Sequence, residues 1–250
     1  MKFSKLILGR IYAVYLALAF ALSLLIVSVV VFYVNHTSRN EVDRSRRVMR
    51  SFRVWMRIFL PLVGCPYSIE GLEKFKKGTN YVVVFNHRSF IDILVSTPSV
   101  PDANKTLAKK ELARIPIFGL VYKSGSILVD RSSLQSRKKS VDDMKQVLKL
   151  GMHLILFPEG TRNKTDQPLR PFYDGAFSVA IETGKPVLPA LIYNTGKILP
   201  PKPAFFAWPH RIRLEFLDPV DTSGYSPDQT AELKQQVHEV MQKRYMSQTC

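Results

Sequence analysis

A long stretch near the N-terminus contains no charged side chain. It runs from Ile11 to Val34, and its 24 residues would form a helix of about 36 Å at roughly 1.5 Å per residue, enough to cross the hydrocarbon core of a bilayer. The apolar core of a signal peptide is shorter, and the A-x-A-like sequence Ala17 to Ala19 lies inside the stretch. The pattern therefore predicts a retained membrane anchor.

Positive charge is distributed unequally around this stretch. Lys2, Lys5 and Arg10 precede it, whereas the arginines that follow it are Arg39, Arg44, Arg46, Arg47, Arg50, Arg53 and Arg57. An excess of lysine and arginine marks the cytoplasmic side of a membrane segment. The part of the chain after the anchor is therefore expected on the cytoplasmic face of the cell membrane.

Basic and apolar residues alternate between Arg44 and Leu62, where Trp55 and Phe59 are among the apolar ones. This alternation is typical of an amphipathic helix at an anionic membrane interface. A solvated structural helix is the alternative. A hairpin of both helices within one leaflet also fits, in place of a spanning helix. We expect residues 1–65 to form the membrane anchor and interfacial basic helix, and residues 66–250 to form one further domain.

After Pro66 the pattern changes to short apolar runs separated by Gly, Pro, Asn and charged clusters. Runs of this kind, rich in β-branched residues, predict strands that alternate with helices. Several of them are apolar throughout, as expected of parallel strands buried on both faces. The expected strands are Tyr67–Glu70, Tyr81–Phe85, Thr106–Ala108, Ser126–Val129, His153–Phe157, Val187–Ile192 and Arg211–Phe216. The fold class is therefore α/β, with a mixed, largely parallel sheet of about seven strands flanked by helices.

Helices are expected where the apolar period changes and a stop residue follows. The expected helices are Phe90–Thr97, Ser136–Leu150 before Gly151, Gly175–Thr183 before Gly184, and a C-terminal helix that Ser226 and Pro227 begin. The proline-rich stretch Leu199 to Pro209 is expected to be a long ordered loop.

The composition narrows the classes of function. A formal net charge of +16 implies an anionic partner, which could be nucleic acid, an anionic bilayer or a phosphorylated substrate. Much of the excess charge lies near the membrane segment, where lipid headgroups account for it. The two cysteines, Cys65 and Cys250, make a disulfide framework or a thiolate metal site improbable.

A polar turn follows the strand expected at Tyr81–Phe85. His87 lies in this turn, and Asp92 lies in the first turn of the helix after it, so the bend brings the two side chains together. A carboxylate that holds one ring nitrogen of a histidine fixes its tautomer and makes the other nitrogen a better base. Ser89 is expected to cap the helix rather than to act as a nucleophile. The attacking hydroxyl is then expected to belong to the substrate.

A second polar cluster follows the strand expected at His153–Phe157. Gly160 permits close backbone approach, Thr161 offers a hydroxyl, and Arg162 presents a planar cationic fork that suits phosphate. Taken alone, Glu159 to Arg162 could instead be a polar turn with an ion pair.

Together the two clusters resemble the motifs of the 1-acyl-sn-glycerol-3-phosphate acyltransferase family, bacterial type. In that family His, four residues and Asp form the catalytic signature, and Phe-Pro-Glu-Gly-Thr-Arg binds the acceptor phosphate. Here these motifs are His87 to Asp92 and Phe157 to Arg162. Two further blocks, Ile115–Arg131 and Val187–Ala190, are similar to the family's other motifs. The apolar N-terminus is similar to the two-helix membrane element of bacterial members.

The resemblance implies a role for each of these residues. His87 and Asp92 are the implied catalytic residues, and the implied substrate contacts are Lys109, Arg131, Glu159, Gly160, Thr161 and Arg162. By the same resemblance, residues 66–250 are expected to form an acyltransferase catalytic domain at the inner membrane. Many members have Phe-Lys-Lys-Gly or Phe-Lys-Thr-Gly where this chain has Phe172 to Gly175, with Asp174 as the third residue. An acid at that position argues against a strongly anionic acceptor, unless Asp174 caps the next helix.

The implied reaction transfers a fatty acyl group from acyl-CoA or acyl-carrier protein to the sn-2 hydroxyl of 1-acylglycerol-3-phosphate, which gives phosphatidic acid. Neither a metal nor another cofactor is expected, and the expected partners are membrane phospholipid, lysophospholipid and the acyl donor. Glycerol-3-phosphate, a lyso-ornithine lipid or another lysophospholipid remains an alternative acceptor. A hydrolase is a less favoured alternative, because water as the nucleophile gives no reason for a phosphate-binding loop. A membrane-tethered nucleic-acid-binding protein fits the charge, but the sequence contains no recognisable nucleic-acid motif.

Overall fold

The computed structural model describes residues 3–130 and 132–249. Its central sheet has the strand order β1-β7-β6-β2-β5-β3-β4. The strands are β1 Tyr67–Glu70, β2 Val82–Phe85, β3 Asn104–Lys109, β4 Ser126–Val129, β5 His153–Leu156, β6 Val187–Tyr193 and β7 Ile212–Phe216. Strands β6, β2, β5, β3 and β4 are parallel, while β7 is antiparallel to β6 and parallel to β1. The expected mixed, largely parallel sheet of about seven strands is confirmed.

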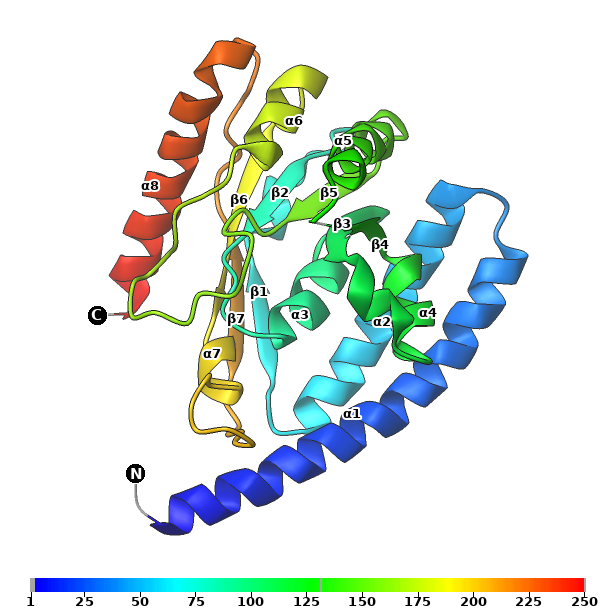
Figure 1. The fold of residues 1–250 in the computed structure, drawn as a ribbon, viewed down its shortest axis with the longest axis vertical. Coiled ribbons are helices and arrows are strands. Elements are labelled where there is room, and N and C mark those ends of the chain that lie inside the picture. The colour runs from blue at the N-terminus through cyan, green and yellow to red at the C-terminus, as the bar shows by residue number, and fades with distance from the viewer. Residues whose placement is uncertain (1–2, 131, 250) are drawn as a thin grey trace.

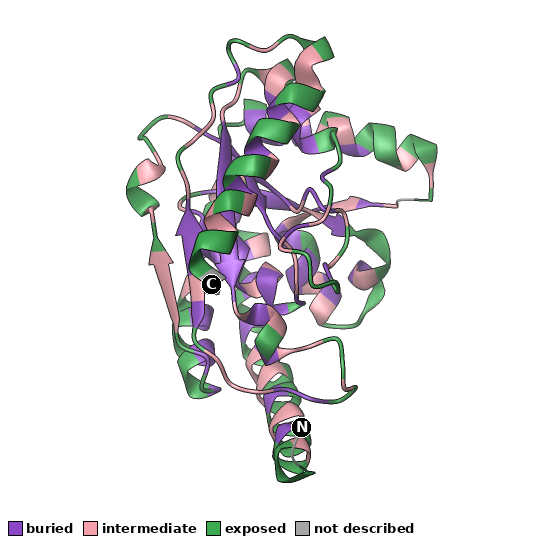
Figure 2. Ribbon diagram, turned by 90° about the vertical axis from the view of Figure 1, so that its left-hand side faces the viewer, coloured by how far each residue is buried: buried purple, intermediate pink, exposed green. Residues whose placement is uncertain are grey.

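The apolar runs form strands because both faces of the sheet are covered (Figure 1). Along β2, Val82 and Val84 face one hydrophobic core while Val83 and Phe85 face the other. The first core packs α5 (Leu134–Lys149), α6 (Gly175–Thr183) and α8 (Thr230–Thr249) against the sheet. The second packs α1 (Phe3–Thr37), α2 (Glu41–Leu62) and α3 (Ile91–Ser99) against the opposite face. In Figure 2 the central strands are buried, whereas the outer helices are exposed on one side.

Local signals account for most helix ends. Gly184 has a φ of 60° after α6, the left-handed conformation that stops a helix, and Gly151 has a φ of 77° after α5. Ser226 and Gln229 form a capping box at the 3-10 turn Pro227–Gln229, which leads into α8. Helix α5 begins at Leu134, two residues before the expected start, because the side chain of Ser133 caps it by accepting the Ser136 N–H.

Four short helical segments of the described residues were not expected from the sequence. They are α4 (Phe118–Ser124), α7 (Thr195–Ile198) and the 3-10 turns Leu72–Lys74 and Lys110–Arg114. Each is too short to show a helical hydrophobic period. Helix α4 packs tightly on the preceding turn, since a Cβ at Gly119 would lie 2.2 Å from the carbonyl oxygen of Ala113.

Helix α1 lies along the rest of the molecule and contacts it near both ends. Near its start the Gly9 carbonyl accepts the Ala207 N–H at 3.1 Å, and near its end the Asn35 amide donates to the Ser124 hydroxyl at 2.9 Å. A buried stripe from Leu16 to Val34 faces α2 and α4, while most other α1 side chains are exposed. Among the described helices, α1 alone has the length and composition to cross a membrane. Both ends of α1 therefore contact the remainder of the chain.

Candidate functional site

The candidate site residues lie at one edge of the sheet. Because β2, β5, β3 and β4 are parallel neighbours, their carboxyl ends meet at the same edge. His87 follows β2, the segment 159–162 follows β5, and Lys109 ends β3. Arg131 follows β4 but lies outside the described residues.

His87 and Asp92 meet as the sequence predicted. His87 Nδ1 lies 2.8 Å from Asp92 Oδ2, and the same oxygen accepts the N–H groups of Arg88 at 2.6 Å and Ser89 at 2.7 Å. Asp92 is fully buried, whereas 14% of the His87 side chain is exposed. With Nδ1 donating to the carboxylate, Nε2 is the nitrogen free to accept a proton.

The bend that joins the pair is held from the neighbouring strand. The buried Asn86 side chain donates to the Ile192 carbonyl at 3.0 Å and accepts the Ile192 N–H at 2.7 Å. These two hydrogen bonds fix the start of the turn against β6. The prediction that Ser89 caps the helix is wrong by one residue, since Phe90 occupies the N-cap position of α3. Ser89 is buried, and its Oγ accepts the Ile91 N–H at 3.4 Å.

Glu159 joins the two motifs. It is 1% exposed, and its carboxylate accepts the His87 N–H at 2.7 Å and the Arg170 N–H at 2.9 Å. Burial raises the pKa of Glu159, while the two backbone N–H groups act against that rise. Both oxygens therefore bond to the protein's own backbone. The structure uses Glu159 as a brace behind His87, and its direct contact with substrate stays a prediction.

The loop after Glu159 reaches the first turn of α3. Gly160 has a φ of 67°, a left-handed conformation that favours glycine, and a Cβ there would lie 2.6 Å from the exposed Tyr173 ring, which would have to move. Thr161 is exposed. The Arg162 guanidinium lies 3.5 Å from the centre of the Phe90 ring. The loop thus brings a cationic group beside the residues that follow His87.

Lys109 and Asp174 form ion pairs with residues outside this cluster. The Lys109 ammonium lies 3.5 Å from Glu111, and 54% of its side chain is exposed. Asp174 does not cap α6 with its side chain. It forms an ion pair at 2.7 Å with Lys234 of α8. The acid that argued against an anionic acceptor is therefore paired within the protein.

Arg88 is a positioning residue that sequence reasoning missed. Its guanidinium donates to the carbonyls of Thr165 at 3.3 Å, Gln167 at 2.5 Å and Pro168 at 3.3 Å. It also lies 5.6 Å from the centre of the Tyr245 ring in α8. Arg88 therefore ties the turn containing His87 to the loop after Arg162. Its place beside His87 was visible in the sequence, but its backbone partners follow no sequence pattern.

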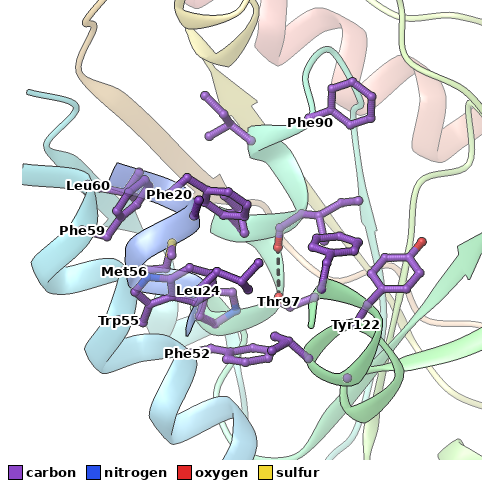
Figure 3. Close-up of a pocket in the computed structure, with 18 of the residues that line it drawn as sticks. Phe20, Leu24, Phe52, Trp55, Met56, Phe59, Leu60, Phe90, Thr97 and Tyr122 are labelled. Carbon is purple, nitrogen blue, oxygen red and sulfur yellow. Dashed lines mark hydrogen bonds between the residues drawn. The ribbon is translucent and has the colours of Figure 1, made fainter. Parts of the chain in front are cut away.

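A cavity of about 660 Å³ opens beside the site. Figure 3 shows apolar side chains of α1 and α2, including Phe20, Trp55 and Phe59, facing Phe90 and Thr97 from the region of α3. Tyr122 of α4 lines another wall. Because Phe90 and Ile91 follow the turn of His87, the cavity begins where the polar site ends. An apolar cavity of this size suits a hydrocarbon chain.

The described residues contain no group of three or more His, Cys, Asp or Glu side chains that could hold a metal ion. The groups that the structure brings together are a histidine–carboxylate pair, an arginine and an apolar cavity. Such an arrangement can remove a proton from a hydroxyl, bind an anion and hold an apolar chain.

Known proteins share this sequence pattern. The Acyltransferase family model matches residues 67–193. The 1-acyl-sn-glycerol-3-phosphate acyltransferase of Haemophilus influenzae is 30% identical over 196 residues, which cover 76% of this chain and 78% of that protein. The 1-acyl-sn-glycerol-3-phosphate acyltransferase of Helicobacter pylori is 31% identical over 240 residues, which cover 95% of this chain and 94% of that protein.

A solved structure shares the fold. The crystal structure of the 1-acyl-sn-glycerophosphate (LPA) acyltransferase PlsC from Thermotoga maritima has a TM-score of 0.82 and 24% sequence identity to this chain. The superposition covers 98% of this chain and 97% of that one. The likeness therefore includes the N-terminal helices as well as the sheet.

Proposed function

We propose that this chain, which belongs to the 1-acyl-sn-glycerol-3-phosphate acyltransferase family, transfers a fatty acyl group to the sn-2 hydroxyl of 1-acylglycerol-3-phosphate. The donor is acyl-CoA or acyl-carrier protein, and the product is phosphatidic acid. The observation that carries the proposal is the His87–Asp92 pair, joined at 2.8 Å beside an apolar cavity of about 660 Å³. Family membership favours acyl transfer over nucleic-acid binding. The positive charge is then explained by contact with anionic lipid and a phosphorylated substrate.

In the proposed reaction His87 Nε2 accepts the proton of the sn-2 hydroxyl while that oxygen attacks the thioester carbonyl. The new C–O bond forms as the C–S bond breaks, and the departing thiolate takes the proton from the imidazolium. Asp92 holds Nδ1 and stabilises the imidazolium while it carries the extra proton. No acyl-enzyme is needed, because the acceptor supplies the nucleophile.

The acceptor phosphate is assigned to the loop after Glu159. Arg162 presents its guanidinium next to Phe90, three residues beyond His87, and an arginine fork binds phosphate through paired hydrogen bonds. Thr161 is exposed beside it. Lys109 ends β3 at the same edge. We assign Lys109, together with Arg131 from its family motif, to the outer part of the headgroup or donor.

The acyl chain is assigned to the cavity between α1, α2 and α3. The exposed side of α1 includes Ile11, Leu18, Leu22 and Val29, whose exposed fractions lie between 61% and 69%. Such an apolar surface suits contact with lipid.

 Since both ends of α1 contact the same domain, we assign residues 1–65 to attachment within one leaflet. The catalytic domain, residues 66–250, then lies on the cytoplasmic face of the inner membrane.

The proposal is tested with the purified full chain in detergent micelles, supplied with one acyl-CoA and a panel of acceptors. The panel contains 1-acylglycerol-3-phosphate, glycerol-3-phosphate, a lyso-ornithine lipid and a phosphate-free monoacylglycerol. Mass spectrometry of the products should show phosphatidic acid formed at the highest kcat/KM. Preference for another acceptor would overturn the acceptor assignment, and release of free fatty acid alone would make the chain a hydrolase.

The donor and the cofactor assignments need separate arms of the same assay. Acyl-carrier protein replaces acyl-CoA in one arm, and the ratio of the two kcat/KM values identifies the preferred donor. EDTA is added in another arm, because the proposed steps use the thioester and the acceptor alone. Loss of activity with EDTA, restored by a divalent cation, would contradict the proposed steps.

A further inference from the structure

The proline-rich segment Leu199–Pro209 presents an unusually exposed aromatic side chain. Phe205 is 89% exposed, the highest value among the large hydrophobic side chains of the described residues, whereas its neighbour Phe206 is 8% exposed. Phe205 also has a φ of 52°, a left-handed conformation that is uncommon for a bulky residue. A single exposed phenylalanine is ordinary. One that is exposed at the cost of an unfavourable backbone conformation calls for a partner.

The segment is fixed against the start of α1. The Ala207 N–H donates to the Gly9 carbonyl at 3.1 Å, and the Phe206 ring packs so closely that a Cβ at Gly9 would lie 2.1 Å from it. The Lys5 ammonium lies 5.2 Å from the centre of the Trp208 ring. Figure 1 shows the segment after α7 at the end of the molecule where α1 begins. The residues that follow Phe205 are therefore fixed against the apolar helix.

The surroundings of Phe205 match a lipid surface in both apolarity and charge. The first turns of α1 expose the apolar side chains Phe3, Ile7, Leu8 and Ile11. Exposed cationic side chains lie within the segment, before or after it in the chain, or on the start of α1, namely Lys5, Arg10, Lys197, Lys202 and Arg211. The sequence has no acidic residue between Thr183 and Leu214. Aromatic and basic side chains together are typical of protein surfaces at an anionic bilayer interface.

We propose that the segment Leu199–Pro209 is a second membrane-contacting element, and that Phe205 inserts into an anionic bilayer beside the start of α1. The inference rests on the membrane attachment in the proposed function and adds a contact from the catalytic domain itself. A second point of contact fixes the orientation of the domain on the bilayer as well as its attachment. Lipid burial also accounts for the exposed ring and the unfavourable backbone of Phe205.

The test measures the depth of a nitroxide label in vesicles of phosphatidylglycerol and phosphatidylcholine in equal parts. The full chain carries Cys250→Ser, and the buried Cys65 stays in place. One label is attached at Phe205→Cys, one at Leu18→Cys on the exposed side of α1, and one at Val240→Cys, an exposed apolar position on α8. Power saturation with oxygen and with a water-soluble nickel complex reports whether each label lies in lipid or in water.

We expect the label at Phe205 to resemble the one at Leu18 and to differ from the one at Val240. A label at Phe205 as water-accessible as the one at Val240, while Leu18 lies in lipid, would overturn this inference and leave the proposed attachment through α1 intact. If Leu18 is also in water, the proposed attachment fails together with the inference. Ala204→Cys, at the neighbouring exposed position, replaces Phe205→Cys if that variant does not fold, and the same outcomes decide.

Discussion

The polar edge of the sheet and the apolar cavity beside it are built in different ways. At the edge, Asp92 and Glu159 accept backbone N–H groups at 2.6 to 2.9 Å, and the carboxylate of Asp92 also holds His87. The cavity is lined mainly by apolar side chains, most of them from α1, α2, α3 and α4. Directional bonds fix positions, whereas apolar packing fixes a volume. Changes at the edge should therefore alter the rate, and changes in the cavity should alter which acyl chain is used.

The largest effect among the supporting residues is expected at Asp92. Asp92→Asn places an amide where one oxygen accepts both His87 Nδ1 and two backbone N–H groups, so the orientation of His87 is lost. The kcat should fall by about 10²-fold or more, as measured by steady-state acyl transfer with both substrates saturating. Asp142→Asn, at an exposed position in α5, is the matched control and should keep the normal rate. Equal rates for the two variants would contradict the role of Asp92.

A smaller effect, on binding, is expected at Arg162. Arg162→Ala removes a charge-assisted hydrogen bond worth about 1.5 to 3 kcal/mol, so KM for 1-acylglycerol-3-phosphate should rise roughly 10- to 150-fold. Arg162→Lys should restore part of the loss. The neighbouring exposed Lys164→Ala serves as the control. If KM for a phosphate-free acceptor rises as much, the loss comes from the contact with Phe90, and the phosphate assignment fails.

In the cavity we expect a change of preference with little loss of the best rate. Ala21 of α1 lines the cavity, and Ala21→Phe should shorten the space for the acyl chain. Each methylene of the acyl chain that can no longer be buried lowers the binding free energy by about 0.8 kcal/mol, which corresponds to a roughly fourfold loss of kcat/KM. Competition between long-chain and short-chain acyl-CoA donors measures the shift. Val14→Phe, at an exposed position on α1 that does not line the cavity, should leave the preference unchanged, and an equal shift there would contradict the cavity assignment.

The smallest effect on acyl transfer is expected at His153, which begins β5 at the opposite edge of the sheet. Burial lowers the pKa of His153 to about 4, and its Nδ1 accepts the Tyr81 N–H at 3.2 Å. Protonation is therefore resisted in the folded state, whereas unfolded histidine takes up a proton near pH 6.5. The free energy of unfolding should fall by up to about 3 kcal/mol as the pH drops from about 6.5 to 4.

Urea denaturation in detergent at several pH values measures this dependence. His153→Asn keeps an acceptor for the Tyr81 N–H and should flatten the pH dependence, while kcat at pH 7 stays near normal. His238→Asn, on α8, should retain the full slope. An unchanged slope in His153→Asn would assign the acid sensitivity to other groups.

The same contrast explains what could be predicted from the sequence. The seven strands were predicted because apolar runs between Gly and Pro clusters are local, and the His87–Asp92 pair because five positions on one bend are local too. The bracing role of Glu159 was not predicted, since its partners His87 and Arg170 lie 72 and 11 positions away. Arg88 was missed for the same reason.

The cavity and the placement of α1 also lay beyond the sequence pattern. The cavity walls come from segments between Ala13 and Leu199, and nothing local marks which faces of these segments will meet. The apolar stretch from Ile11 to Val34 predicted a helix, but spanning and one-leaflet arrangements have the same hydrophobic pattern. The contacts of Gly9 with Ala207 and of Asn35 with Ser124 are the observations on which we base the proposed one-leaflet arrangement.

The central claim is that His87 acts as the general base for transfer to the acceptor hydroxyl. Its most direct test is the kcat of His87→Ala, measured on folded protein in micelles with acyl donor saturating and 1-acylglycerol-3-phosphate varied. His238→Ala is the matched control. We predict that kcat falls by about 10²-fold or more while KM for the acceptor stays near normal, because the base acts in the transition state. A near-normal kcat for His87→Ala would contradict the account.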